Sequence, residues 1–273
     1  MGDEVMRTIM ERASVRRFTE QPVAHAVVER LVLAAQQAPF TGQMYSFVAT
    51  MDQEQRQRAA AVLGGLVLRA PVFMLVCVDF RKLEKFIAFR GRRNLSDDLG
   101  MLFLGIQDAS YAAQNLVLAA EAEGLGSCFL GAAPFRAAPL IEMFGLPERV
   151  YPLVGLVLGH PAEHPKPRPR IPLEHCLFWD RYLDLQEDDV ARAMSVMDAG
   201  MIREGYYAKL GARIPLPSGD DQVGFDEYGW SEHMSRKYGE HGVSKTAGLQ
   251  EYLEQQAINV RGEQPPESRG PER

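Results

Sequence analysis

Residues 105–132 read GIQDASYAAQNLVLAAEAEGLGSCFLGA, and this stretch decides the fold class of the 273-residue chain. Residues 105–120 of this stretch belong to the most apolar long segment of the sequence, 99–120. That segment predicts one long helix over about 96–123. Gly124 is a common C-terminal stop for a helix, and a short strand at 127–132 follows directly. The segment is interrupted too often for a membrane span, by Gln107, Asp108, Gln114 and Asn115. We therefore expect a helix that is buried on most sides in the middle of a domain.

Helical and extended segments follow one another on both sides of this helix. Apolar residues at helical spacing predict helices at 4–11, 23–38, 53–63, 140–147 and 189–210, and a helical tail that reaches about Ile258. Continuous or valine-rich apolar runs predict strands at 47–50, 71–80 and 151–159. Few strands, many helices and one very long central helix indicate an α+β layered fold. The GxGxxG fingerprint of dinucleotide-binding folds is missing.

Composition excludes several classes of protein. The net charge of −6 argues against a general nucleic-acid binder, which needs a basic surface. Cys77, Cys128 and Cys176 are too few and too far apart for a disulfide framework or a zinc site, and His160 and His164 lack further ligands, so we expect no metal. Residues 1–12 hold no signal peptide, so we expect a cytoplasmic protein. The last residues, 262–273, have no apolar side chain beyond proline, and we expect them to be disordered.

Three arginines gather in RASVRRF, residues 12–18. In an extended chain alternate side chains share a face, so Arg12, Ser14 and Arg16 would lie side by side. Two guanidinium groups that flank a hydroxyl suit a phosphate, because arginine donates hydrogen bonds in a planar fork. Surface cations are more often simply solvated. On this stretch alone, both a phosphate site and a polar turn remain open.

Five stretches in the same order resemble the FMN-dependent nitroreductase family. They are RASVRRF, AAQQAPFTGQMYSFV at 34–48, the central helix 105–132, LVGLVLGHP with KPRPRIP at 153–172, and GWSEHMSRKYG at 229–239. In the second stretch, two residues of the family pattern are absent between Gly42 and Gln43. The last stretch resembles the larger, NADPH-preferring branch of flavin reductases and oxygen-insensitive nitroreductases. The resemblance covers roughly residues 5 to 260.

The resemblance implies a fold and an activity. The fold would be a central, mostly antiparallel sheet flanked by helices, in one domain over 1–261 with a C-terminal excursion at 188–260. Family members are homodimers with FMN at the subunit interface. The activity would be a two-electron, ping-pong hydride transfer from NAD(P)H through FMN to a small-molecule acceptor such as a nitroaromatic, a quinone or a flavin. Because the flavin carries the hydride, no catalytic side chain is expected.

The resemblance also assigns the cofactor-binding residues. Arg12 and Ser14 would take the phosphate and ribityl end of FMN, and Arg16 would reach N1 and O2 of the ring and tune the flavin. Arg168 and Arg170, from the basic loop after the last strand, would complete the phosphate site. The resemblance thus implies that cations from two distant segments converge on one FMN, with Arg12, Arg168 and Arg170 at its phosphate and Arg16 at its ring.

Further assignments concern the ring and the electron donor. Gln43 would hydrogen-bond the ring edge or the ribityl chain, with Thr41 and Tyr45 nearby. The backbone amides of Gly131 and Ala132 would face the flavin, provided that Ala132 avoids the backbone angles that only glycine adopts. Lys209 and Arg213 are candidates for binding NADPH, which we expect to be preferred over NADH.

Two other functions remain open at this point. The same fold could host a different reaction, such as free-flavin reduction or reductive dehalogenation. The chain could also be a non-catalytic module that holds FMN without turning it over. The resemblance does not identify the physiological acceptor.

Overall fold

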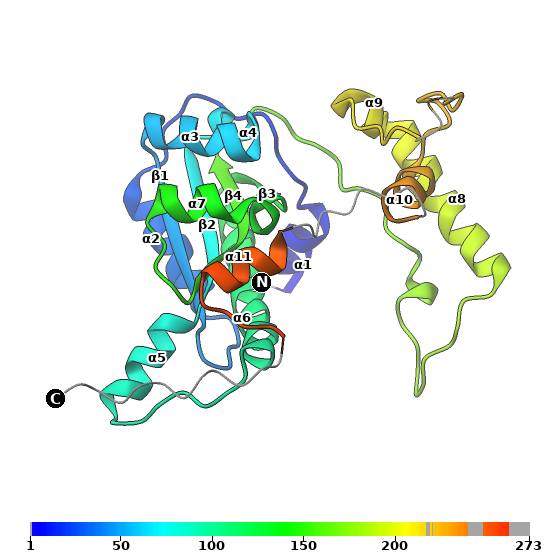
Figure 1. Ribbon diagram of the computed structural model, residues 1–273. Helices are drawn as coiled ribbons and strands as arrows, with labels where there is room; N and C mark the ends of the chain where they lie inside the picture. Colours follow the sequence, from blue (N-terminus) through cyan, green and yellow to red (C-terminus); the bar gives the residue numbers. More distant parts are fainter. Residues whose placement is uncertain (1, 217–218, 220, 240–247, 262–273) are drawn as a thin grey trace. The chain divides into compact units, whose positions relative to one another are not determined.

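The computed structural model describes residues 2–216, 219, 221–239 and 248–261, in two compact units (Figure 1). The first unit comprises Met1–Lys166 together with Thr246–Arg273, and the second comprises Pro167–Lys245. The second unit overlaps the excursion expected at 188–260, but it begins earlier and ends earlier. The tail expected to be disordered, 262–273, lies outside the described residues.

A four-stranded sheet forms the centre of the first unit. Its strands are β1 (Tyr45–Thr50), β2 (Val72–Asp79), β3 (Gly126–Leu130) and β4 (Val150–Gly159), in the order β1-β2-β4-β3 with every neighbour antiparallel. The expected antiparallel sheet is confirmed. All eight residues of β2 are buried, as its continuous apolar sequence predicts for a strand covered on both faces.

Alternate residues of β2 pack into two different hydrophobic clusters. Met74 and Val76 face one cluster, to which α2 (His25–Ala35) and α6 (Asp98–Ala122) contribute. Phe73 and Leu75 face the other cluster, with α3 (Gln53–Leu63), α4 (Leu66–Arg69) and α7 (Ala137–Phe144). The period of two along a strand thus places a helical layer on each face of the sheet (Figure 1). The predicted α+β layered fold is confirmed.

The long helix α6 is only partly buried, so the expectation of burial on most sides is wrong for this unit. Its C-terminal half packs on the sheet through Ala113, Leu116 and Val117. Its N-terminal half leaves Phe103 64% exposed and also exposes Leu99, Ile106 and Tyr111. An apolar run in the sequence predicts a helix with an apolar surface, but it does not indicate how much of that surface is buried within the same chain.

Several element boundaries differ from the sequence prediction. The helix expected at 23–38 is shorter, the helix expected at 140–147 begins at Ala137, and α4, α5 (Phe80–Phe89) and the short helix η1 (Ala133–Arg136) were not predicted. Asp79 explains α5, because its side chain accepts a hydrogen bond from Lys82 N at 3.0 Å and so caps the helix. An aspartate that ends a strand thus also begins a helix.

Two further helices complete the first unit. α1 (Gly2–Glu11) packs beside α6, and α11 (Leu249–Gln255) returns to contact α7. Arg149 fixes the segment after α11, because it pairs with Glu84 and Asp98 at 2.7 and 2.6 Å while Asp98 also accepts from Asn259 N. Among the described residues no helix has the length and apolarity needed to cross a bilayer.

The second unit is helical, with η2 (Leu173–His175), α8 (Glu187–Glu204), α9 (Tyr206–Leu210) and α10 (Trp230–Tyr238). The single helix expected at 189–210 is broken at Gly205, whose φ of 59° ends α8 in the left-handed conformation. Arg236, in the GWSEHMSRKYG stretch, is buried and pairs with Asp221 and Glu232, at 2.6 Å each. That stretch therefore holds this unit together.

Candidate functional site

Residues 12–18 form an extended strip that starts where α1 ends. Ser14 forms a parallel bridge with Ser127 of β3, and Val15 N donates to Ser127 O at 2.9 Å. Val15 is buried and lies so close to β3 that a Cβ at Gly126 would come within 2.6 Å of its side chain. The extended conformation predicted for RASVRRF is confirmed, with glycine at the point of closest approach.

The spacing-two face of the strip exists as predicted. Arg12, Ser14 and Arg16 are all half-buried, and both arginines contact Ser14. Arg12 Nη2 lies 3.4 Å from Ser14 Oγ, and Arg16 Nη1 donates to Ser14 O at 3.3 Å. The strip therefore presents two guanidinium groups and a hydroxyl as one donor-rich surface.

A carboxylate that the sequence reading missed fixes the other end of the strip. Glu163 Oε1 accepts hydrogen bonds from Arg16 N at 2.6 Å and from Arg17 N at 3.0 Å. Two backbone bonds add to this anchor, Ala162 N to Arg17 O and Thr19 N to His160 O. The segment after β4 thus holds the strip in place over a sequence separation of 147 residues.

Polar atoms without partners gather at the Arg12 end of the strip. Arg12 Nε and Ser127 Oγ are buried and make no hydrogen bond within the described residues, and Ser127 is 0% exposed. Buried polar groups in proteins are nearly always paired, so such atoms mark a place where a ligand or water completes the structure. A phosphate or a ribityl hydroxyl offers the acceptors and donors that these atoms lack. The donor set therefore fits the phosphate and ribityl end of FMN.

Glu121, near the C-terminal end of α6, lies beside this cluster. Burial raises the pKa of its carboxyl, and the Arg12 guanidinium opposes that rise. One of its oxygens, Oε1, is also buried without a hydrogen bond to any described residue. Glu121 and the Arg12 guanidinium thus interact electrostatically, and this favours a role for Glu121 in orienting that guanidinium.

A second buried carboxylate organises the loop that carries Gln43. Asp108, in the middle of α6, is 1% exposed and accepts hydrogen bonds from Thr41 N at 2.6 Å, Gly42 N at 3.0 Å and Met44 N at 3.1 Å. Between these amides Gln43 has a φ of 48°, which is uncommon for a residue with a side chain. We name this arrangement the Asp108 clamp. A single acidic residue within an apolar helix needs hydrogen-bond partners when it is buried. Asp108 in its apolar surroundings was therefore the sequence feature that could have predicted such an arrangement.

The other residues assigned to the ring lie near this clamp or in the turn after β3. Tyr45 is 4% exposed in the hydrophobic core, where burial raises the pKa of its hydroxyl, with a smaller contribution from the Asp108 charge. Gly131 and Ala132 form an exposed turn before η1. Ala132 has φ −83° and ψ −13°, so an alanine fits there without strain, as the assignment required.

Arg168 and Arg170 belong to the second unit, so their convergence with the strip stays a prediction. Within that unit the Arg168 guanidinium lies 4.1 Å from the centre of the Tyr206 ring. Arg170 Nη1 donates to the carbonyl oxygens of Arg168 and Pro169 at 3.0 and 3.1 Å. These contacts shape the basic loop and neutralise neither charge.

The two residues considered for NADPH have local contacts of their own. Lys209 donates to Glu204 O. Arg213 pairs with Asp221 at 3.1 Å and lies over the Phe225 and Tyr228 rings at 5.3 and 5.5 Å. Arg213 therefore contributes to the packing of the second unit, and a role in donor binding stays a prediction for both residues.

The sequence model of the nitroreductase family matches residues 9–160. Two relatives extend the match. The FMN reductase (NAD(P)H) of Bacillus subtilis is 33% identical over 193 residues, which cover 68% of this chain and 77% of the relative. The oxygen-insensitive NADPH nitroreductase of Salmonella typhimurium is 32% identical over 183 residues, covering 66% and 75%.

A solved structure agrees with these sequence matches. It is the NADPH:FMN oxidoreductase from Vibrio harveyi complexed with NAD+. It superposes with a TM-score of 0.76 at 26% identity, over 94% of this chain and 99% of the other. The similarity thus extends over both units, beyond the segment that the family model matches.

Proposed function

We infer the function from one premise, that this chain belongs to the nitroreductase family. It is an NAD(P)H-dependent oxidoreductase with FMN as its cofactor. FMN, when bound, supplies the ring that accepts a hydride and passes it on. We propose that the electrons go to nitroaromatics, quinones or flavins in two alternating half-reactions. The observation that carries the proposal is the donor-rich strip with its unpaired buried atoms, Arg12 Nε and Ser127 Oγ.

In this proposal the Arg12 end of the strip binds the phosphate and ribityl end of the cofactor. Arg12 and Ser14 donate to it, and the Ser127 hydroxyl completes the set. Glu121 orients the Arg12 guanidinium from α6. Arg168 and Arg170 add two cations from the basic loop, which offsets the repulsion that a phosphate meets in an acidic chain.

The ring is held by the other half of the site. Arg16 supplies a cation at the pyrimidine edge, because the Glu163 anchor fixes its backbone. Gln43 offers its amide from the Asp108 clamp, with Thr41 beside it, and Tyr45 supports that loop from the core. The turn at Gly131 and Ala132 supplies backbone amides. The protein thus contributes orientation and electrostatics, while no side chain acts as a nucleophile.

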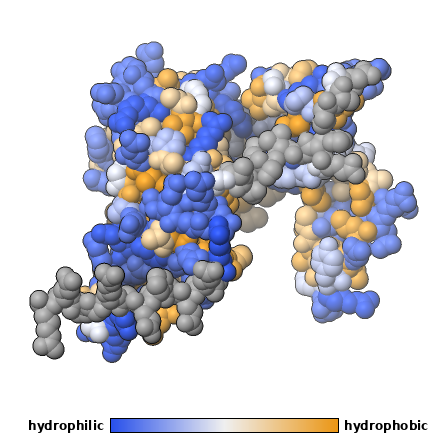
Figure 2. Space-filling model, in the orientation of Figure 1, coloured by the Kyte–Doolittle hydropathy of each residue, from blue (hydrophilic) through white to orange (hydrophobic). Residues whose placement is uncertain are grey.

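We also propose a homodimer in which the exposed half of α6 is covered. α1 packs beside α6 and exposes Val5, Met6, Ile9 and Met10, so both helices carry exposed apolar side chains. Apolar side chains are visible on the surface of both units (Figure 2). Many exposed apolar side chains on two packed helices are a common sign of a protein interface. Sedimentation of the FMN-loaded protein should give a dimer, and Phe103→Asp should shift it toward monomer.

An anaerobic experiment tests the proposed reaction. Mixing the FMN-loaded protein with NADPH should bleach the yellow flavin, and adding nitrofurazone or a quinone should restore the colour. If the flavin stays oxidised, the chain is a non-catalytic flavin module. NADH in place of NADPH tests the donor preference expected from Lys209 and Arg213.

A second candidate is a reductase whose main acceptor is free flavin. The identity of 33% to an FMN reductase favours it. Steady-state turnover with free FMN, measured beside nitrofurazone and a quinone at matched concentrations, separates the two. A kcat/KM for free FMN more than tenfold above the other acceptors would identify the flavin as the main acceptor.

A further inference from the structure

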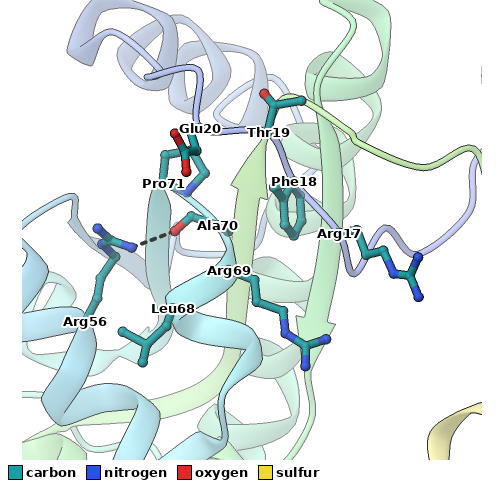
Figure 3. Close-up of a pocket in the computed structure, with 9 residues that line it drawn as sticks. All are labelled: Arg17, Phe18, Thr19, Glu20, Arg56, Leu68, Arg69, Ala70 and Pro71. Carbon is teal, nitrogen blue, oxygen red and sulfur yellow. Dashed lines mark hydrogen bonds between the residues drawn. The ribbon is translucent and has the colours of Figure 1, made fainter.

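The first unit contains a hollow of about 660 Å³ that the flavin site does not use. Residues 17–20, at the end of the strip, form one wall and residues 68–71, from α4 to the start of β2, form the other (Figure 3). Arg56 of α3 lies at the rim. Because neighbouring side chains of an extended chain point to opposite faces, Arg17 faces away from the surface that Arg16 helps to form. The strip thus borders two sites, one on each face.

Three guanidinium groups and a single carboxylate line this hollow. The cations are Arg17, Arg56 and Arg69, and the carboxylate is Glu20. In Figure 3 the Arg17 and Arg69 side chains both extend on the side away from Arg56. Glu163, which pairs with Arg17, adds a second carboxylate beside the hollow, so this group of side chains carries one net positive charge in a chain whose net charge is −6. It creates a local attraction for anions that the chain as a whole does not have.

The three cations are held in different ways. Arg56 donates to two neutral carbonyl oxygens, Ala70 O at 2.9 Å and Met51 O at 3.4 Å, which fix its guanidinium and leave its charge. Arg17 forms an ion pair with Glu163, with Nε 3.9 Å from Oε2, and its side chain is still 78% exposed. Arg69 forms no ion pair with any residue that the structure describes. Arg56 is therefore preorganised, whereas Arg69 and the exposed part of the Arg17 guanidinium are available to a ligand.

Apolar side chains share the lining of the hollow with these cations. Phe18 is half-buried and packs against the second hydrophobic cluster, and Leu68 and Pro71 also line the hollow. A hollow with both apolar and cationic side chains can recognise a flat body that carries an anionic group. Arg17 and Arg69 suit a phosphate, because each guanidinium can donate two parallel hydrogen bonds. The volume is that of a site for one small ligand.

We propose that this hollow binds a mononucleotide, with the phosphate at Arg17 and Arg69 and the base on Phe18 and Leu68. The site is separate from the proposed flavin site. The proposal therefore does not depend on which acceptor the enzyme reduces.

Calorimetric titration of the FMN-saturated protein with AMP tests it. FMN saturation keeps the nucleotide out of the flavin site. We expect saturable binding at one site per chain that both Arg17→Met and Arg69→Met weaken at least tenfold. Arg58→Met is the matched control, since Arg58 lies on α3 like Arg56 and is exposed outside the hollow; it should leave AMP binding unchanged. Adenosine and inorganic phosphate should each bind at least tenfold more weakly than AMP.

Three results would overturn the proposal. AMP could fail to bind saturably, or it could bind equally well to both variants and so occupy the electron-donor site. Inorganic phosphate could bind as tightly as AMP, which would leave a solvated cation cluster only. FMN content and NADPH oxidation, measured in each variant, should stay unchanged. Failure here therefore leaves the proposed enzyme function standing, and failure of that function would leave AMP binding intact.

Discussion

The Asp108 clamp and the Arg12 end of the strip are both buried polar regions beside α6, and their hydrogen bonding is opposite. The Asp108 carboxylate accepts bonds from three backbone amides of the loop at 41–44. Arg12 Nε and Ser127 Oγ are buried without any partner among the described residues. A satisfied buried charge belongs to the fold, whereas unsatisfied donors are ready for a ligand.

This difference predicts different consequences of mutation. Removing the charge of the clamp should lower the free energy of unfolding whether or not a cofactor is bound. Removing a donor at the Arg12 end should mainly weaken cofactor binding.

Asp108→Ala should cause the largest loss of stability. It removes the acceptor of three loop amides, one of them at the buried Met44, and a hydrogen bond to a charged group contributes roughly 1.5–3 kcal/mol, so the free energy of unfolding should fall by roughly 3 kcal/mol or more. Urea denaturation of the cofactor-free protein measures this. Asp97→Ala is the matched control on the same helix, because Asp97 caps α6 by accepting from Gly100 N; it should cost about 1 kcal/mol. Equal losses for the two variants would show that the clamp is an ordinary cap.

Arg12→Met should weaken FMN binding at least tenfold and leave the free energy of unfolding of the cofactor-free protein within about 0.5 kcal/mol of wild type. A hydrogen bond to a charged group contributes roughly 1.5–3 kcal/mol, which gives the expected loss of affinity. Fluorescence titration with FMN measures the first quantity and urea denaturation the second. Arg7→Met, an exposed arginine on α1, serves as control and should change neither. A variant with a lower free energy of unfolding and an unchanged FMN affinity would show that Arg12 stabilises the fold and does not bind the cofactor.

Gln43→Gly should separate stability from function within the clamp. A side chain at φ 48° costs about 1 kcal/mol, which glycine avoids, although its extra freedom in the unfolded chain offsets part of the gain. We expect a stability equal to wild type or higher by up to about 1 kcal/mol, together with slower reduction by NADPH in stopped flow. A variant that is less stable and reacts at the wild-type rate would contradict a functional reason for this conformation.

Glu121→Gln should change how stability depends on pH, by the smallest amount. Burial raises the pKa of Glu121 in the folded state, so the folded protein holds this proton more tightly than the unfolded chain does. Its contribution is fully present below the unfolded pKa and is lost as the pH rises through the folded pKa. The variant should therefore lack that decline, and its advantage over wild type should develop between the unfolded and the folded pKa and be complete above the folded pKa. Parallel curves for both proteins from acid to neutral pH would exclude this effect.

The fold was largely predictable because its signals are local. Helical spacing, the continuous apolar run of β2 and the glycine stop after α6 each lie within one short segment. The errors arose where a residue has two roles or a partner beyond its segment. Asp79 ends a strand and caps a helix, and the N-terminal half of α6 is apolar and yet exposed in this unit.

The site was predictable in part. The spacing of Arg12, Ser14 and Arg16 anticipated their common face, because period two is a property of any extended chain. Glu163 and Asp108 were missed, since their hydrogen bonds span 147 and 64 to 67 residues and no local pattern records such contacts. Ser127 was missed for the same reason, as only the pairing of β3 with the strip brings it to Arg12.

The central claim is that the Arg12 end of the strip receives the phosphate of the cofactor. Comparing the dissociation constants of FMN and riboflavin tests it most directly, since the two ligands differ only in that phosphate. Wild type should bind FMN more tightly than riboflavin, and Arg12→Met should reduce this ratio at least tenfold while Arg17→Met, on the opposite face, leaves it unchanged. If Arg12→Met weakens both ligands equally, Arg12 does not bind the phosphate and the account is wrong.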